Sequence, residues 1–183
     1  SEMCIRDRLI SVDPYTSVWS FADELNADVT RHWTGKEQAL LGVVDVDGVS
    51  YRFMGKETPE EGASVRFATA ARQLSVNVLP TQTYYTFECG PVLLDVVFTA
   101  PLLLDDLDRM SMPVNYISWQ VRSADQKKHE VRVSVEAFSS LAVNTEDQAV
   151  MVEREVENGI SYLKTGTAEQ AVLSVSYTHL RAH

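Results

Sequence analysis

The residues best suited to binding or catalysis are concentrated in "DPYTSVWSFADELNADVTRHWTG", residues 13–35. This segment contains two tryptophans, two further aromatic residues, several carboxylates and the run Arg31-His32-Trp33. A guanidinium is a forked donor that matches carboxylates, and Trp, Tyr and Arg are enriched at the centres of protein interfaces. The segment has neither the period of a strand nor that of a helix, so its residue types alone suggest a role.

Two interpretations of this segment stay open. In the structural one, aromatic side chains (Tyr15, Trp19 and Phe21) hold an irregular stretch of chain on a sheet, and Arg31 pairs with Asp13 or Asp23. In the functional one, the segment faces a ligand, with Arg31 beside His32 and Trp33. Composition alone favours the structural interpretation.

A thiol nucleophile is a second chemical option. Cysteine catalysis needs a thiolate and an imidazole that deprotonates it, for which the candidates are Cys89 and His32. The sequence around Cys89 has no signature of such an enzyme, and "CGP" at residues 89–91 indicates a turn. The structural interpretation of Cys89 is therefore favoured, and no catalytic residue is assigned.

Clustered carboxylates in "LLLDDLDRM", residues 102–110, are a third option, because hard cations prefer oxygen ligands. Asp105, Asp106 and Asp108 do not have the spacing of an EF-hand loop, so they are weak metal candidates. A solvated acidic loop that caps a short helical turn is favoured. His129 is expected to be a surface residue, and it lies too far from His32 in sequence to indicate a metal site, so no metal or cofactor is expected.

Aromatic residues on strands raise the option of stacking on sugars. Trp119 is in phase with Ile117 and Val121, which predicts a core position. Tyr84 and Tyr85 are adjacent, so one should face inward and the other outward.

The sequence predicts a series of β-strands that would position these residues. Residues 40–46 and 49–55 flank Asp47-Gly48, which predicts a two-residue type I′ hairpin. Period-two patterns or apolar runs predict further strands at residues 72–79, 83–88, 92–100, 115–123, 129–138, 149–156 and 160–165. We expect "SADQKK", residues 123–128, to be a hairpin loop, Asn158-Gly159 to be a turn, and the small residues before Arg72 to form a helical turn.

This pattern predicts an all-β fold, an antiparallel β-sandwich that is truncated at its C-terminus. Both ends of the chain resemble translated adapter sequence at the edges of metagenomic reads and are treated as non-native. The expected divisions are a non-native end (1–8), an aromatic-rich segment with a hairpin (9–56), a connection (57–71), an incomplete sandwich (72–174) and a second non-native end (175–183).

Composition restricts the partners. The chain has 183 residues, of which 45% are hydrophobic, enough for one domain with a core. Its formal net charge of −10 argues against nucleic acid and against anionic membranes. No apolar run approaches the length of a membrane-spanning helix, so no membrane insertion is expected.

Four segments taken together resemble a known family. They are "VDPYTSVWSFADELNADVTRHWTG", "VDGVSYRFMG", "LPTQTYYTFECGPVLLDVVFTAPLLLDDLD" and "PVNYISWQVRS". In this order, over nearly all of residues 9–140, they are similar to the N-terminal region of bacterial and fungal glutaminase A-like proteins. One departure is Ser111-Met112-Pro113, where the family pattern suggests Ser-Arg-Pro.

The resemblance implies a long, usually secreted or periplasmic protein in which a supersandwich-like β region precedes a helical toroid. The toroid is expected to hydrolyse L-glutamine to L-glutamate and ammonia. On this basis the 183 residues are an accessory region, inactive alone, whose partner is the C-terminal helical catalytic domain of the same chain. The candidates for the interface with that domain, or for the rim of its active site, are Asp13, Tyr15, Trp19, Arg31, His32 and Trp33. The alternative, from another class, is a carbohydrate-binding or cell-envelope binding module.

Overall fold

The structure, a computed structural model, describes residues 7–56, 68–143, 145 and 147–169. It divides into two units, with the boundary between Leu141 and Ala142, and each unit is described by itself. Among these residues, the first unit contains ten strands and the second a hairpin. Helix is restricted to α1 (Leu107–Met110) and a 3-10 turn, η1 (Ser139–Ala142), within these ranges. The predicted all-β class is confirmed.

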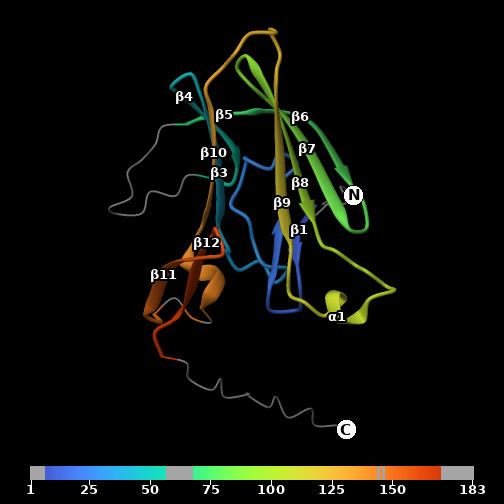
Figure 1. The fold of residues 1–183 in the computed structure, drawn as a ribbon, viewed down its shortest axis with the longest axis vertical. Helices are drawn as coiled ribbons and strands as arrows, with labels where there is room; N and C mark the ends of the chain where they lie inside the picture. Colours follow the sequence, from blue (N-terminus) through green and yellow to red (C-terminus); the bar gives the residue numbers. More distant parts are fainter. Residues whose placement is uncertain (1–6, 57–67, 144, 146, 170–183) are drawn as a thin grey trace. The chain divides into compact units, whose positions relative to one another are not determined.

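Four consecutive strands form what we call the meander sheet, in the order β6-β7-β8-β9 with every pair antiparallel (Figure 1). They are β6 (Arg72–Val78), β7 (Gln82–Cys89), β8 (Val92–Thr99) and β9 (Tyr116–Ser123). Cys89 pairs with Val92 across a two-residue turn whose first residue, Gly90, has a φ of 60°. A positive φ at that position is what a type II′ hairpin requires.

A second sheet, which we call the mixed sheet, has the order β10-β3-β4-β5. Its strands are β3 (Leu40–Val46), β4 (Val49–Met54), β5 (Thr69–Ala70) and β10 (Val131–Ala137). Asp47 and Gly48 have φ angles of 50° and 86°, so the predicted type I′ hairpin between β3 and β4 is confirmed. β10 pairs antiparallel with β3, and β5 pairs parallel with β4.

A short hairpin precedes both sheets and joins β1 (Asp7–Ser11) to β2 (Ser17–Ser20). β2 lies inside the segment expected to be irregular. Its four residues are too few to show a period in the sequence, so this strand was not predicted. Asp7 and Arg8, which fall within the end expected to be non-native, pair with Ser20 and Trp19.

The core of the first unit lies between the two sheets. Phe53 of the mixed sheet and Phe87 of the meander sheet meet with ring centroids 5.8 Å apart. On β7 and β8 every second residue is buried, from Thr83 to Cys89 and from Val92 to Phe98. Tyr85 adds an edge-on contact with Phe98 at 6.0 Å, a favourable aromatic geometry. The predicted sandwich-like architecture is therefore confirmed.

Two local expectations were wrong. Residues 123–128 are not a hairpin loop, because β9 lies in the meander sheet and β10 crosses to pair with β3 in the mixed sheet. The small residues before Arg72 include β5 instead of a helical turn, since Tyr51 and Arg52 offer a strand edge to Thr69 and Ala70. The connection at residues 57–67 lies outside the described residues.

The second unit is an antiparallel hairpin of β11 (Val150–Glu157) and β12 (Ile160–Thr167). Asn158 and Gly159 have φ angles of 51° and 78°, which confirms the predicted turn. Apolar side chains are exposed on both faces of this hairpin, among them Val152 and Leu163 on one face and Met151 and Ile160 on the other. Throughout the described residues there is no helix of the length and apolarity needed to cross a membrane.

Candidate interface site

The turn between β1 and β2 is ordered by one carboxylate. Asp13 Oδ1 accepts hydrogen bonds from the backbone N–H groups of Tyr15, at 2.8 Å, and Thr16, at 2.7 Å. Such a side-chain contact closes a turn without a sheet partner. The Asp13 carboxylate therefore fixes the backbone at Tyr15, whose residue surface is 85% exposed.

His32 and Trp33 bind the same backbone oxygen of this turn. His32 Nε2 and Trp33 Nε1 each lie 2.8 Å from the carbonyl oxygen of Pro14. A carbonyl only accepts, so His32 carries a proton on Nε2, and Nδ1 lies 2.7 Å from the Thr34 hydroxyl. The two rings are 5.4 Å apart, and Trp33 is 51% exposed. We call Asp13, Pro14, Tyr15, His32 and Trp33 the aromatic surface.

Trp19 and Arg31 lie beside this surface and pair with each other through the backbone. Trp19 N–H donates to the Arg31 carbonyl at 2.7 Å, and Arg31 N–H returns a bond to the Trp19 carbonyl at 2.9 Å. The Arg31 guanidinium lies 3.4 Å from both Asp28 and Glu37. The expected pairing of Arg31 with Asp13 or Asp23 was wrong, since Glu37 and Asp28 flank it and Asp13 closes its own turn.

Polar side chains connect residues 23–30 to β4 of the mixed sheet and, through the Leu25 N–H bond to Gln73 Oε1, to β6 of the meander sheet. Asn26 Nδ2 donates to the carbonyl oxygens of Arg52, at 2.9 Å, and Ala71, at 2.7 Å. Thr30 Oγ1 donates to the Gln38 carbonyl at 2.7 Å. These buried contacts give the irregular backbone its hydrogen-bond partners. No sequence pattern indicated Asn26 or Thr30, because their partners are backbone groups, which side-chain patterns do not reveal.

The structure thus brings four of the six predicted interface residues to one exposed surface: Asp13, Tyr15, His32 and Trp33. Trp19 and Arg31 support it from the neighbouring extended segment. Trp19 Nε1 is buried and has no hydrogen-bond partner among the described residues. The interface role of all six residues stays a prediction.

Cys89 is a core residue. Its side chain is 0% exposed on the inner face of β7. Burial, with a smaller contribution from the Glu88 carboxylate, raises the pKa of the Cys89 thiol to about 12. A thiol with this pKa stays protonated at neutral pH and is a poor nucleophile. The structural interpretation of Cys89 is confirmed.

The acidic loop caps α1, as expected. Asp106 Oδ1 accepts from the Arg109 backbone N–H at 3.0 Å, and Arg109 Nε lies 3.2 Å from Asp106 Oδ2. Arg109 therefore supplies the cation that holds this loop, while residue 112 is an exposed methionine. Within the described ranges, no three His, Cys, Asp or Glu side chains gather as a metal site.

The aromatic residues of the meander sheet divide between its faces. Tyr85 is 1% exposed, while Tyr84 lies on the outer face with its hydroxyl 2.5 Å from Gln82 Oε1, so the predicted alternation is confirmed. The core position predicted for Trp119 was wrong. Trp119 shares the inner face with its partner Val96, but β9 is an edge strand, and the indole is 50% exposed.

Comparison with known proteins places both units in a family. A family model described as "Domain of unknown function (DUF5127)" matches residues 81–182, and another, "Domain of unknown function (DUF4964)", matches residues 7–63. The chain belongs to the DUF5127 family. No solved structure matches it.

A curated protein is also similar to this chain. The chain is 24% identical over 170 residues to "Glutaminase A" from Aspergillus oryzae (strain ATCC 42149 / RIB 40). The alignment covers 88% of this chain and 24% of the relative, so the chain spans about a quarter of that protein's length. A distant glutaminase A-like relationship is therefore confirmed. The aromatic surface lies in the DUF4964 match, and the acidic loop lies in the DUF5127 match.

Two polar sites of this DUF5127 protein were missed in the sequence. His129, expected on the surface, is only 10% exposed at its side chain, because Nδ1 lies 2.6 Å from Asp47 and Nε2 lies 2.8 Å from Asp125. Hydrogen bonds to these carboxylates, Asp125 first, raise the pKa of His129, and the same contact with His129 is the main cause that lowers the pKa of Asp125 to about 2. His129 therefore ties the β9–β10 connection to the β3–β4 turn.

The second missed site joins the start of β1 to the core. The Tyr85 hydroxyl donates to Asp7 Oδ2 at 2.7 Å, and Asp7 is 4% exposed. Burial raises the pKa of the Asp7 carboxyl, although the bond from Tyr85 opposes this shift. Neither residue stands in a recognisable motif, so only the fold reveals the pair.

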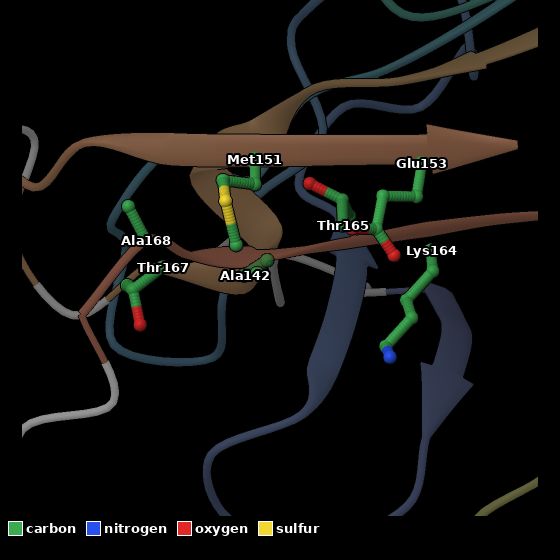
Figure 2. A pocket seen from close by; sticks show the side chains of 8 residues that line it. Ala142, Met151, Glu153, Lys164, Thr165, Thr167 and Ala168 are labelled. Atoms are coloured by element: carbon green, nitrogen blue, oxygen red, sulfur yellow. The ribbon is translucent and has the colours of Figure 1, made fainter.

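The hairpin unit of the DUF5127 match has its own hollow, with a volume of about 520 Å³ (Figure 2). Glu153 and Lys164 are cross-strand partners at one end of it, and Met151 extends toward Ala142 at the other (Figure 2). A two-stranded hairpin is marginally stable by itself in water. We therefore assign no function to this hollow.

Proposed function

We propose that these residues form an accessory β-sandwich region of a glutaminase A-like amidohydrolase and dock onto a separate catalytic domain. The observation that carries this proposal is the extent of the similarity, since 88% of this chain aligns with only 24% of Glutaminase A. The parent reaction would be hydrolysis of L-glutamine to L-glutamate and ammonia. The catalytic domain would be a helical toroid C-terminal to this region, in a protein secreted or exported to the periplasm.

The geometry of the described side chains supports an accessory role. The groups most suited to nucleophilic or acid–base chemistry are already engaged: Cys89 is buried as a thiol, His32 is bound to Pro14 and Thr34, and His129 lies between two carboxylates. The exposed Tyr15 and Trp33 are held in place by hydrogen bonds, which reduces the entropic cost of burying them against a partner.

Extending the coding sequence in the source DNA and expressing the whole protein tests the proposal. Ammonia release from L-glutamine is expected from the whole protein and not from residues 1–183. Alanine at Arg31 and at His32 should lower activity or stability of the whole protein, whereas Lys128→Ala, at an exposed site, should not. Wild-type behaviour of both Arg31→Ala and His32→Ala would rule out the interface role, and a whole protein inactive on L-glutamine would rule out the reaction.

A carbohydrate-binding or cell-envelope binding role is the second candidate. It is favoured by Tyr84 and Tyr116, which share the outer face of the meander sheet, where Tyr116 is 55% exposed. Sugars stack on aromatic rings at such faces, and Ser118 and Gln120 on the same face of β9 could donate hydrogen bonds. Affinity of residues 1–183 for polysaccharides that is lost in Tyr116→Ala would support this role over docking.

A further inference from the structure

The connection between β8 and β9 exposes a dense group of apolar side chains. We call residues 102–114 the apolar loop; it includes the acidic loop described above. Six of its side chains are between 40% and 79% exposed: Leu102, Leu103, Leu104, Leu107, Met112 and Val114. Isolated exposed apolar residues are ordinary, but a contiguous group of this density marks interaction surfaces.

The backbone of the apolar loop is ordered by hydrogen bonds. Its backbone is closed by successive bonds, from Asp106 N–H to the Leu103 carbonyl at 3.0 Å, from Met110 N–H to Asp106 at 2.9 Å and from Ser111 N–H to Leu107 at 2.9 Å. Helix α1 nevertheless buries none of its residues. Helices in proteins gain most of their stability by packing an apolar face. The face that α1 would pack, with Leu107 68% exposed, is not covered by any described residue of this unit.

A hollow of about 380 Å³ lies within the apolar loop. It is lined by Leu102, Leu103, Leu104, Asp105, Asp106 and Arg109. Arg109 is neutralised by Asp106, and in the described part of the chain neither Asp105 nor Asp108 forms an ion pair. The loop is therefore apolar with an excess of negative charge.

This charge distribution indicates which kind of partner could cover the apolar loop. A two-fold dimer through the apolar loop would bring its aspartates against those of the second copy, because a two-fold axis places the same patch on both sides. Anionic lipid headgroups would be repelled in the same way. A complementary surface has an apolar centre and a rim of Lys and Arg.

We propose that the apolar loop docks onto such a basic-rimmed apolar surface in another domain of the same, longer polypeptide. This inference rests on the proposed function, in which about three quarters of the related chain lies outside the aligned region. The docking surface includes the aromatic surface. Asn115 Oδ1 accepts from Ser11 N–H at 3.3 Å, so the end of the apolar loop is tied to the end of β1, next to the turn that carries Tyr15 (Figure 1).

Hydrogen–deuterium exchange of the whole protein and of residues 1–183 tests this proposal. Amides of the apolar loop should exchange about tenfold slower in the whole protein, because docking suppresses local opening. The double variant Leu104→Lys, Leu107→Lys should remove that protection in the whole protein. Both side chains are exposed, so the variant should leave the melting temperature of residues 1–183 unchanged. Val49→Lys, at another exposed apolar site, is the matched control and should keep the protection.

Equal exchange of the apolar loop in the two proteins would overturn the proposal. Protection that rises with protein concentration, or that needs phosphatidylglycerol vesicles, would overturn it in favour of a second copy or a lipid surface. The readout does not depend on activity. A whole protein that is inactive on L-glutamine but protects the loop would reject the proposed reaction and keep the docking surface.

Discussion

The strand β8 and the apolar loop that follows it are both rich in apolar residues, but those residues are buried on β8 and exposed in the loop. On β8, Leu94, Val96 and Phe98 are at most 1% exposed, because every second side chain faces the mixed sheet. A few residues later, Leu104 and Leu107 are 79% and 68% exposed. Apolar composition alone therefore does not decide burial in this chain. Burial requires a covering element, and none of the described residues of this unit covers the apolar loop.

The largest expected effect would test this contrast directly. Phe87→Ala should lower the free energy of unfolding by about 3–5 kcal/mol, because it removes a ring packed between the two sheets and leaves a cavity. Leu104→Ala should change it by no more than about 0.5 kcal/mol in residues 1–183. Urea unfolding followed by circular dichroism measures both. A loss for Leu104→Ala as large as that for Phe87→Ala would show that the apolar loop packs within this unit.

The next prediction compares two tyrosines of the meander sheet. Tyr85→Phe should cost about 1–3 kcal/mol of unfolding free energy, because it leaves the buried Asp7 carboxylate without its donor. Tyr116→Phe, at an exposed site, should cost almost nothing. Urea unfolding again provides the measurement. In a Tyr85→Phe background, Asp7→Asn should recover part of the loss, since it removes the buried charge; no recovery would mean that the charge is not the cause.

The buried half of this comparison could be predicted from the sequence. Asp47-Gly48 and Asn158-Gly159 mark hairpins because only certain residues adopt their positive φ angles at low cost. Period-two alternation located β6 to β10 because one face of each strand is apolar. Such signals are local, so they indicate each strand and not its partner. The crossing from β9 to β10 was therefore missed, and so was the edge position that exposes Trp119.

The candidate site was predictable only in part. Its residue types indicated an interface, and the structure joins Tyr15, His32 and Trp33 through Pro14. The joining atom is a backbone oxygen, which no side-chain pattern can indicate. His129 was misjudged for a related reason, since its partner Asp47 is 82 residues away.

His129 forms a polar link between the two sheets through Asp47 and Asp125. The pKa of folded His129 is raised above the ordinary histidine value of 6.5, so the stability that His129 contributes is present below pH 6.5 and is lost as pH rises through the folded pKa. The pKa values of Asp47 and Asp125 are lowered, so their share is lost only as pH falls through the folded values, about 2 for Asp125. The link is therefore strongest between these limits.

Removing the imidazole of His129 should weaken the pH dependence of the unfolding free energy. His129→Gln should abolish the fall in unfolding free energy between pH 6.5 and the folded pKa, and Asp47→Asn should reduce it. Two further groups contact the carboxylates of the link: Lys127 Nζ lies 3.9 Å from Asp125 Oδ2, and the Glu130 backbone N–H donates to Asp47 Oδ1 at 2.9 Å. Urea unfolding across the pH range gives the slopes. Identical slopes for wild type and His129→Gln would mean that the link does not contribute to stability.

The smallest expected effect distinguishes support of the fold from contact with a partner. In residues 1–183, Arg31→Ala should cost about 0.2–1 kcal/mol, because its ion pairs are 3.4 Å long and partly exposed. If Arg31 only supports the segment around Trp19, the whole protein should lose the same amount. If the aromatic surface and the apolar loop dock together, Arg31→Ala should cost more in the whole protein than in residues 1–183. Equal losses in chemical unfolding of the two proteins would confine Arg31 to the structural role, and a docking surface would then have to rest on Tyr15, Trp33 and the apolar loop.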